Sequence, residues 1–252
     1  MKKLVLMALA AVAATSSAWA VNGAIKTATG VKKGDITWSG ASKTYTVKQG
    51  KASVAVPLAD VEDIWVEKPA GFDQAVKSRN VAMLKKIIKD YRMLEWDKPA
   101  GSALVDAYLN GTTKNPQAAY DAAQDIIRDD KTAAYKGDLA PAYWQALFRL
   151  GKTQQLENCL KKAATDGDRA SSANALIMRG DMICAADTPA SHRQALVDAY
   201  LRVALMYVDP ECAQSRADAM LRAANSFSKL GMASREQDFK AMAQQVQSSV
   251  RR

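Results

Sequence analysis

The chain is poor in the residues that carry most enzyme chemistry. Its 252 residues include a single histidine, His192, and three cysteines. One histidine cannot supply the paired imidazoles of a typical zinc site, and we expect His192 to be a capping or surface residue near the start of a helix. Glycine and proline, at 13 and 7 residues, are too few for the many turns of an all-β protein of this length.

Common motifs of catalytic and cofactor sites are absent as well. The sequence contains no Gly-x-x-x-x-Gly-Lys, no His-Glu-x-x-His, no Gly-x-Ser-x-Gly and no Cys-x-x-Cys. Asp166-Gly167-Asp168 begins like a calcium loop, but no closing acid follows at the required spacing. We interpret Asp168 as the N-cap of a helix instead. The sequence therefore predicts no enzyme activity, no cofactor and no metal, although paired carboxylates for glycoside chemistry stay possible among 26 acids.

Disulfides and membrane spans are also not expected. An odd number of cysteines, namely Cys159, Cys184 and Cys212, cannot all pair within one chain. Each lies in a stretch that reads as helical, where a free cysteine behaves as a small apolar residue. After residue 20, no segment reaches the roughly 18 uncharged apolar residues that a membrane helix needs. We predict no structural disulfide and no membrane span.

The first twenty residues have the pattern of a secretory signal. Lys2 and Lys3 precede an uncharged apolar run over 4–14, and Ala18-Trp19-Ala20 follows with small residues at the cleavage positions. We predict a signal peptide over 1–20, cleaved after Ala20, and a mature protein in the periplasm or secreted. An uncleaved anchor helix is the alternative.

The net charge of the chain is positive. The chain has 35 basic and 26 acidic residues, and removal of the leader takes two lysines, leaving 33 against 26, or +7. Such a surplus can indicate nucleic acid in a cytoplasmic protein, but export argues against that partner. An anionic envelope polymer is a more sensible acidic neighbour, and a merely solvated surface is the alternative.

Residues 21–68 are predicted to form a small β module. Short runs of β-branched and aromatic residues alternate with glycines at 36–38, 44–47, 54–56 and 64–66. Gln49-Gly50 is a hairpin signal, because glycine readily takes the positive φ of a tight turn. Such short strands bury little as a flat sheet, so we expect closure into a small barrel. The order, with one helical turn before the last strand, resembles SH3-like barrels.

After Pro69 the apolar period changes from two to about 3.6, which predicts a helical domain over 69–252. Gly111, Gly151 and Gly231 are spaced by 40 and 80 residues, and each is expected to end a helix in the left-handed conformation. The fold class is therefore mixed and mainly α: the β module, then an α-solenoid of about five helix pairs. We place the pairs at 70–94, 98–129, 138–165, 169–208 and 212–249.

Two apolar stripes coincide between 192 and 208. One contains Ala195, Ala199, Val203 and Tyr207, and the other contains Val197, Leu201, Leu205 and Val208. Apolar residues on most of a helix surface indicate a helix that is packed on both sides.

Several positions match a known repeat. In the last unit, Ala224, Phe227 and Gly231 match the small residue, the aromatic residue and the turn glycine of this repeat, and Ala243 matches a later small position. In the fourth unit, residues 175–181 are similar to the repeat, and Gly180 and Ala195 are small residues at positions where its helices pack closely. The helical domain thus resembles a degenerate tetratricopeptide-repeat protein of the bacterial envelope. The chain departs from the pattern at Glu236 and in its spacing, near 40 rather than about 34. The resemblance implies a scaffold that holds peptides or protein surfaces in a concave groove.

Four side chains are candidate partner-binding residues: Trp38, Trp65, Tyr143 and Arg179. A tryptophan ring suits either a barrel core or a sugar or peptide platform, and we expect one of Trp38 and Trp65 in the core and the other at the surface. Tyr143 and Trp144 point about 100° apart on a helix, so at most one faces a groove.

The predicted function is an exported, non-enzymatic scaffold that binds a protein partner in the cell envelope. The alternative is an envelope glycan-binding protein, or a polysaccharide-active enzyme, that uses the β module. A structural subunit of a larger envelope assembly is a third possibility.

Overall fold

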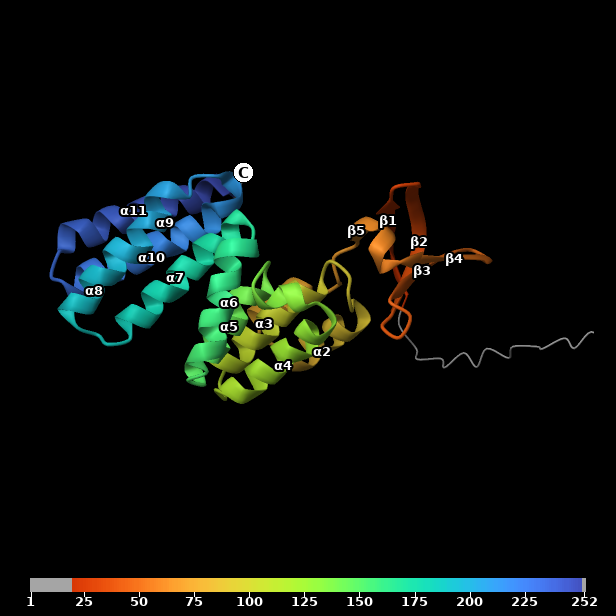
Figure 1. Ribbon diagram of the computed structural model, residues 1–252, viewed down its shortest axis with the longest axis horizontal. Helices are drawn as coiled ribbons and strands as arrows, with labels where there is room; N and C mark the ends of the chain where they lie inside the picture. Colours follow the sequence, from red (N-terminus) through yellow and green to blue (C-terminus); the bar gives the residue numbers. More distant parts are fainter. Residues whose placement is uncertain (1–19, 251–252) are drawn as a thin grey trace, which may run out of the picture. The chain divides into compact units, whose positions relative to one another are not determined.

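The computed structural model describes residues 20–250, which divide into two compact units, one ending at Glu67 and the other beginning at Lys68 (Figure 1). The predicted leader lies outside the described residues, apart from Ala20. In the described part of the chain, no helix is long and apolar enough to cross a membrane.

The first unit is an antiparallel sheet. Its strands are β1 (Val21–Thr27), β2 (Gly30–Ser39), β3 (Thr44–Gln49), β4 (Ala52–Pro57) and β5 (Val61–Val66), in the spatial order β4-β3-β2-β1-β5. The predicted hairpin joins β3 to β4, and Gly50 in its turn has a φ of +57°. The helical turn expected before the last strand is also present, at Leu58–Asp60.

The sheet is not a closed barrel, so that part of the prediction is wrong. Among the described residues, β4 pairs with β3 alone and β5 with β1 alone, which leaves both as edges. The physical reason is the small amount of apolar surface to bury. On β4 only Val56 is buried, and a strand with one buried side chain gains little hydrophobic free energy by curling onto the opposite edge.

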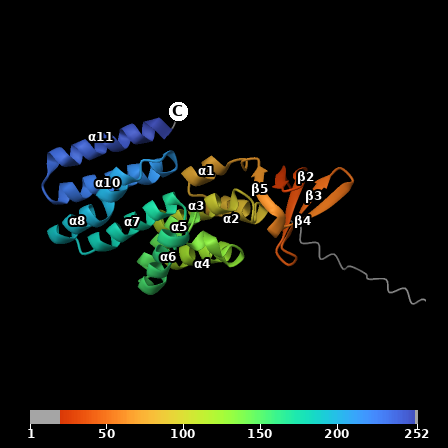
Figure 2. The ribbon, with the colours of Figure 1, turned by 45° about the horizontal axis from the view of Figure 1, so that its top comes forward.

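The second unit is helical, and the predicted order of a β module followed by helices is confirmed. Its helices are α1 (Phe72–Lys77), α2 (Val81–Asp90), α3 (Asp97–Asn110), α4 (Pro116–Asp129), α5 (Leu139–Arg149), α6 (Thr153–Asp166), α7 (Arg169–Cys184), α8 (Pro189–Ala195), α9 (Leu201–Met206), α10 (Ala213–Lys229) and α11 (Ala233–Val250). A π-helical turn, η3 (Leu196–Tyr200), joins α8 to α9, and a short 3-10 turn, η4 (Pro210–Cys212), precedes α10. Helices α7, α8, α10 and α11 lie side by side (Figure 2).

Local chemistry sets several helix ends. The Asp168 carboxylate accepts a hydrogen bond from the Ser171 backbone N–H at 2.7 Å, which confirms the predicted N-cap of α7. Gly151 and Gly231 have the predicted positive φ, at +65° and +72°. Gly111 differs, with a φ of −74°. A Cβ there would lie 2.3 Å from a backbone carbonyl oxygen one turn earlier, so position 111 needs glycine because space is lacking.

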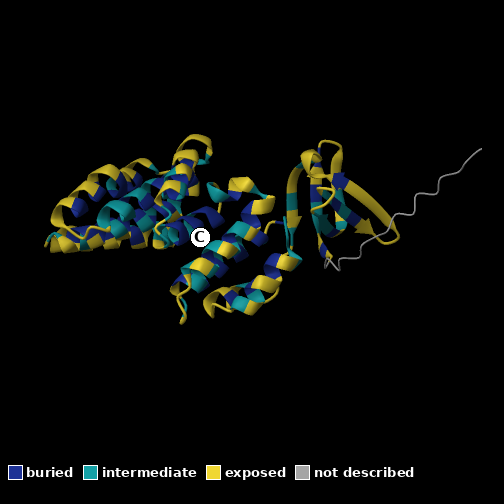
Figure 3. Cartoon of the chain, turned by 60° about the horizontal axis from the view of Figure 1, so that its bottom comes forward, coloured by how far each residue is buried: buried dark blue, intermediate teal, exposed yellow. Residues whose placement is uncertain are grey.

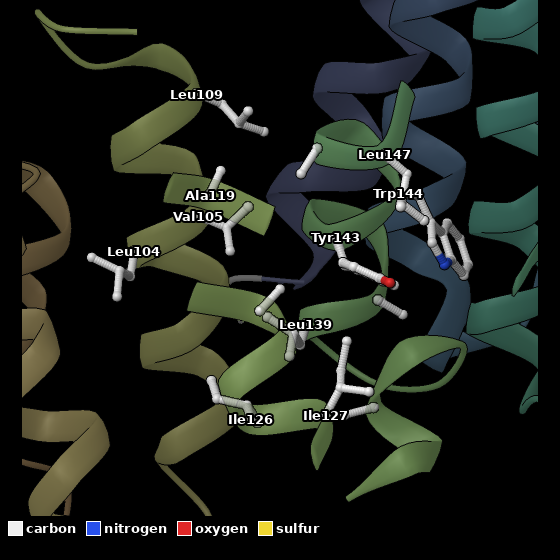
Figure 4. Packing of buried hydrophobic residues seen from close by; sticks show 14 of the residues in the cluster. Leu104, Val105, Leu109, Ala119, Ile126, Ile127, Leu139, Tyr143, Trp144 and Leu147 are labelled. Carbon is white, nitrogen blue, oxygen red and sulfur yellow. The ribbon is translucent and has the colours of Figure 1, made fainter. Parts of the chain in front are cut away.

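Buried apolar side chains hold the helices together. Exposed residues lie on the outer faces of the helices and buried ones between them (Figure 3). Side chains of α3, α4 and α5 share one core cluster (Figure 4), in which the indole Nε1 of Trp144 donates to the carbonyl oxygen of Ala134 at 2.8 Å. A second cluster gathers residues of α7 through α11.

The segment from α8 to α9 is packed on one side, which corrects the prediction of two packed sides. Of the stripe that begins at Ala195, the first three residues are buried against α7 and α10. Of the other stripe, Val197, Leu205 and Val208 are 66%, 65% and 61% exposed, while Leu201 is partly buried against the second core cluster. A helical pattern shows where apolar side chains gather but does not show whether the chain supplies a neighbour for each stripe.

Candidate functional site

A groove in the helical unit is the candidate functional site. It has a volume of about 690 Å³ and is lined by residues of α1, α3, α5, α7 and α10, together with the turns that precede the last three. These are the first helices of the five predicted pairs. Residues that are far apart in the sequence, such as Phe72 and Asp218, therefore contribute to one concave surface.

Small side chains keep the groove open. Ser102 and Ala103 of α3 and Ala170 of α7 line it where longer side chains would fill it. Asn174 of α7 and Ser215 of α10 add an amide and a hydroxyl to the same surface. Such groups can donate to and accept from the backbone of a bound peptide.

The groove is acidic although the protein is basic. Its lining includes Asp106, Asp138, Asp168, Glu211 and Asp218, and no lysine or arginine is among the lining residues that the structure describes. Carboxylates gathered on a concave surface raise the local concentration of cationic ligands. The electrostatics of the groove thus oppose the overall charge of the chain.

Neighbouring groups compensate some of these charges. The Arg79 guanidinium Nε lies 3.0 Å from a carboxylate oxygen of Asp106. Burial raises the pKa of Asp218, while the nearby Arg222 and a hydrogen bond from the Gln214 amide act in the opposite direction. Asp138 and Glu211 are exposed and form no ion pair within residues 20–250. These two carboxylates are the ones most available to a bound cation.

A second hollow, of about 600 Å³, lies among α2, α3 and α4. Its charged residues largely satisfy one another. The Arg92 Nη1 lies 3.0 Å from a carboxylate oxygen of Asp125, and the Lys85 ammonium lies 5.7 Å from the centre of the Tyr108 ring. Because a ligand would have to displace these contacts, this hollow is the weaker candidate.

The two tryptophans of the β unit occupy different environments. Trp38 of β2 is half-buried, and its ring centre lies 4.7 Å from that of Tyr45 on β3. Its indole N–H has no hydrogen-bond partner in the described part of the chain. Trp65 of β5 is 45% exposed. The structure does not bring the two rings together, because β1 separates their strands.

The other two candidate residues do not line the groove. Tyr143 is 1% exposed and Trp144 is fully buried, and neither lines the candidate groove. The Tyr143 hydroxyl bonds to the side-chain amides of Gln124 and Gln155, and burial raises its pKa. Both faces of α5 are covered because α3, α4, α6 and α7 all pack on it. Arg179 is half-buried on α7 and makes no ion pair among the described residues.

His192 is neither a cap nor a surface residue, contrary to the prediction. It is 4% exposed, and its ring contacts Asp187, Cys184 and Ser226. Thr188 provides the N-cap of α8 instead. The sequence signal was the proximity of a cysteine, an aspartate and a histidine within nine residues, but the contribution of Ser226 from α10 has no local signal.

None of the protein-family models, curated proteins or solved structures matches this chain. Among the described residues, no group of three or more His, Cys, Asp or Glu side chains is placed to hold a metal ion.

Proposed function

We propose that this chain is an exported, non-enzymatic scaffold that binds a segment of a protein partner in the cell envelope. In this proposal the helical unit is a solenoid similar to tetratricopeptide repeats. The observation that carries the proposal is the groove, because residues of α1, α3, α5, α7 and α10 all line it. A stack of helix pairs forms such a continuous concave surface.

The lining favours a basic segment. Asp138 and Glu211 supply exposed carboxylates, and Asn174 and Ser215 can bond to the backbone of a peptide. One exposed ion pair contributes only about 0–1 kcal/mol, so the proposed partner presents several lysines or arginines together. The groove does not favour an anionic envelope polymer, the other expected partner.

The direct test uses the mature chain, beginning at Val21, and two fluorescent peptides of equal length, one rich in lysine and one rich in glutamate. We expect the lysine-rich peptide to bind and the glutamate-rich peptide not to bind. Binding should weaken as salt is added, because salt screens exposed charges. The double variant Asp138→Asn/Glu211→Gln should bind several-fold more weakly.

A matched control removes two exposed acidic groups outside the groove, in the variant Glu95→Gln/Asp238→Asn. It has the same net charge as the groove variant, so it should bind like the wild type. Equal losses in both variants would show that the peptide senses net charge only, and the groove would lose its proposed role. Capture of envelope proteins by the wild-type chain but not by the groove variant, identified by mass spectrometry, would then name the partner.

The exported location depends on the leader. Sequencing the N-terminus of the protein recovered from a cell that exports it tests this part of the proposal. A chain beginning at Val21 agrees with cleavage after Ala20, and a chain recovered intact from the cytoplasm contradicts it.

Glycan recognition by the β unit is the alternative, and the exposed Trp65 on β5 is the observation that favours it. An indole offers a flat apolar face to a sugar ring. If the alternative holds, the full chain binds purified envelope polysaccharide, and Trp65→Ala abolishes that binding. Val54 on β4 is also an exposed apolar residue, at 44%. Val54→Ala is therefore the control and should leave polysaccharide binding unchanged.

A further inference from the structure

A cysteine, a histidine and an aspartate meet at the end of α7, away from the groove lining. The Cys184 Sγ lies 3.4 Å from the His192 Nδ1, and the His192 Nε2 lies 3.0 Å from a carboxylate oxygen of Asp187. The Ser226 hydroxyl of α10 lies 3.3 Å from the same Nδ1 and 3.8 Å from Sγ. The imidazole is thus held between a thiol and a carboxylate.

This order of groups is the one that activates a nucleophile. A base within hydrogen-bond reach of a thiol, itself oriented by a third group, is the common arrangement of nucleophilic sites. Asp187 accepts from Nε2–H, which leaves the Nδ1 lone pair directed at the thiol. His192 is 4% exposed, so its ring has little freedom to turn away.

Neighbouring groups hold the Asp187 carboxylate in place. The hydrogen bond from His192 and the nearby Lys229 lower the pKa of its carboxyl group, and the Lys229 ammonium lies 3.1 Å from its carboxylate. Asp187 also has a φ of +44°, a conformation that costs free energy for a residue other than glycine. The carboxylate therefore stays charged and in place to fix the imidazole.

Other groups also surround the thiol. The Tyr200 hydroxyl of η3 interacts with Cys184 and donates to Asp181 of α7 at 2.8 Å. Arg222 of α10 pairs with Asp181 at 3.2 Å. The Ser226 hydroxyl, 3.8 Å from Sγ, can donate to a sulfur anion, which is the form that attacks an electrophile.

The other two cysteines lack these features. Cys159 and Cys212 are buried, and Cys184 is partly exposed. Burial raises the pKa of Cys159 to about 11 and also raises that of Cys212. Cys184 is followed by an exposed stretch, 185–190. The three thiols thus allow an internal comparison.

We infer that Cys184 is a nucleophilic thiol that undergoes exchange with a disulfide of low molecular weight. His192 Nδ1 takes the thiol proton, and the sulfur anion attacks one sulfur of the disulfide. The disulfide bond breaks as the new S–S bond forms, and the departing sulfur takes the proton from the imidazole. Cys184 ends in a mixed disulfide, one free thiol is released, and no further oxidant is required. Asp187 is a positioning residue in this step.

The test uses the reduced full chain and glutathione disulfide at near-neutral pH. Samples are blocked with a maleimide over time, and each cysteine is quantified by peptide mass spectrometry. We expect Cys184 to form the mixed disulfide at least roughly tenfold faster than Cys159 and Cys212, because exchange follows thiolate formation and access. An equal rate at all three cysteines would overturn the inference.

Two variants separate activation from simple exposure. His192→Asn should slow exchange at Cys184 about tenfold, and Asp187→Asn should slow it less and change its dependence on pH. If His192 and Asp187 had a purely structural role, these variants should instead speed the reaction, since a loosened fold speeds reaction at all three cysteines. Asp187 is largely exposed, so Asp187→Asn still tests the inference if His192→Asn fails to fold. Arg193→Gln, an exposed neighbour on α8, is the control. If neither of the two test variants slows exchange at Cys184, the inference is wrong.

Discussion

Gly180 of α7 lies directly against the ring of Tyr200 in η3. A Cβ at position 180 would stand 2.4 Å from Cε1 of that ring. The ring has little freedom to move aside, because its hydroxyl donates to Asp181 at 2.8 Å. The small residue that the repeat resemblance requires at position 180 thus has a direct structural reason, which is the close approach of two helical segments.

Gly180→Ala should therefore destabilise the helical unit. Overpacking costs about 1–3 kcal/mol, and the better helix propensity of alanine returns about 1 kcal/mol, so we expect a net loss of up to about 2 kcal/mol. Urea unfolding followed by far-UV circular dichroism measures it. Adding Tyr200→Leu makes room, and Gly180→Ala should cost clearly less in that background. An equal cost in both backgrounds would mean that the ring is not the obstacle.

The two stripes of the α8–α9 segment should respond differently to a polar side chain. Val197 is 66% exposed and Val203 is fully buried. We expect Val197→Gln to change the free energy of unfolding by no more than about 0.5 kcal/mol, and Val203→Gln to cost several times more, because it buries an amide. A large loss from Val197→Gln would show that something covers this stripe in solution, such as a second copy of the chain.

Tyr143→Phe should affect stability without affecting binding. The hydroxyl accepts a hydrogen bond from Gln155 at 2.6 Å, and its loss leaves that amide and the amide of Gln124 without an acceptor. We expect a loss of about 1 kcal/mol in the free energy of unfolding. Affinity for the lysine-rich peptide should stay as in the wild type, because Tyr143 does not line the groove. A several-fold weaker affinity would show that Tyr143 contributes to the binding surface.

Asp97 should make stability depend on pH. This carboxyl group is 1% exposed, and burial raises its pKa against the opposing effects of Lys98 and the Met93 backbone N–H. The unfolded chain then releases the proton first, so stability is lost as pH rises from about 4 through the folded pKa. In Asp97→Asn this loss is absent, while the side-chain oxygen can still accept from Met93.

The measurement is the difference in unfolding free energy between Asp97→Asn and the wild type across that range. As pH rises, the unfolding free energy of Asp97→Asn should increase relative to that of the wild type. Asp238→Asn, at an exposed position on α11, is the control and should show no such trend. A trend in the opposite direction for Asp97→Asn would mean that the charged form is stabilised in the folded protein.

Local features could be predicted from the sequence because their causes lie within a few residues. The turn at Gly50 requires a positive φ, and the cap at Asp168 requires a carboxylate three residues before an unpaired amide. The change of apolar period near Pro69 likewise marks the passage from strands to helices. The order of β module and helices followed from these signals alone.

Burial was decided only by the tertiary structure, because the burial of a residue depends on which distant segments of the chain pack against it. Tyr143 and Trp144 are both covered since several helices surround α5, and Val197 is exposed since no segment within residues 20–250 covers it. The same reason applies to closure of the sheet, which depended on how much apolar surface its edge strands had to offer.

The chain by itself determined its element types and several of its helix ends, through interactions between near neighbours. Only the folded structure brought five acids, on or just before α3, α5, α7 and α10, into one groove and placed Ser226 beside the pair of Cys184 and His192. Such sites join side chains that are tens of residues apart, and their separation in space is set by helix packing, which no local pattern encodes.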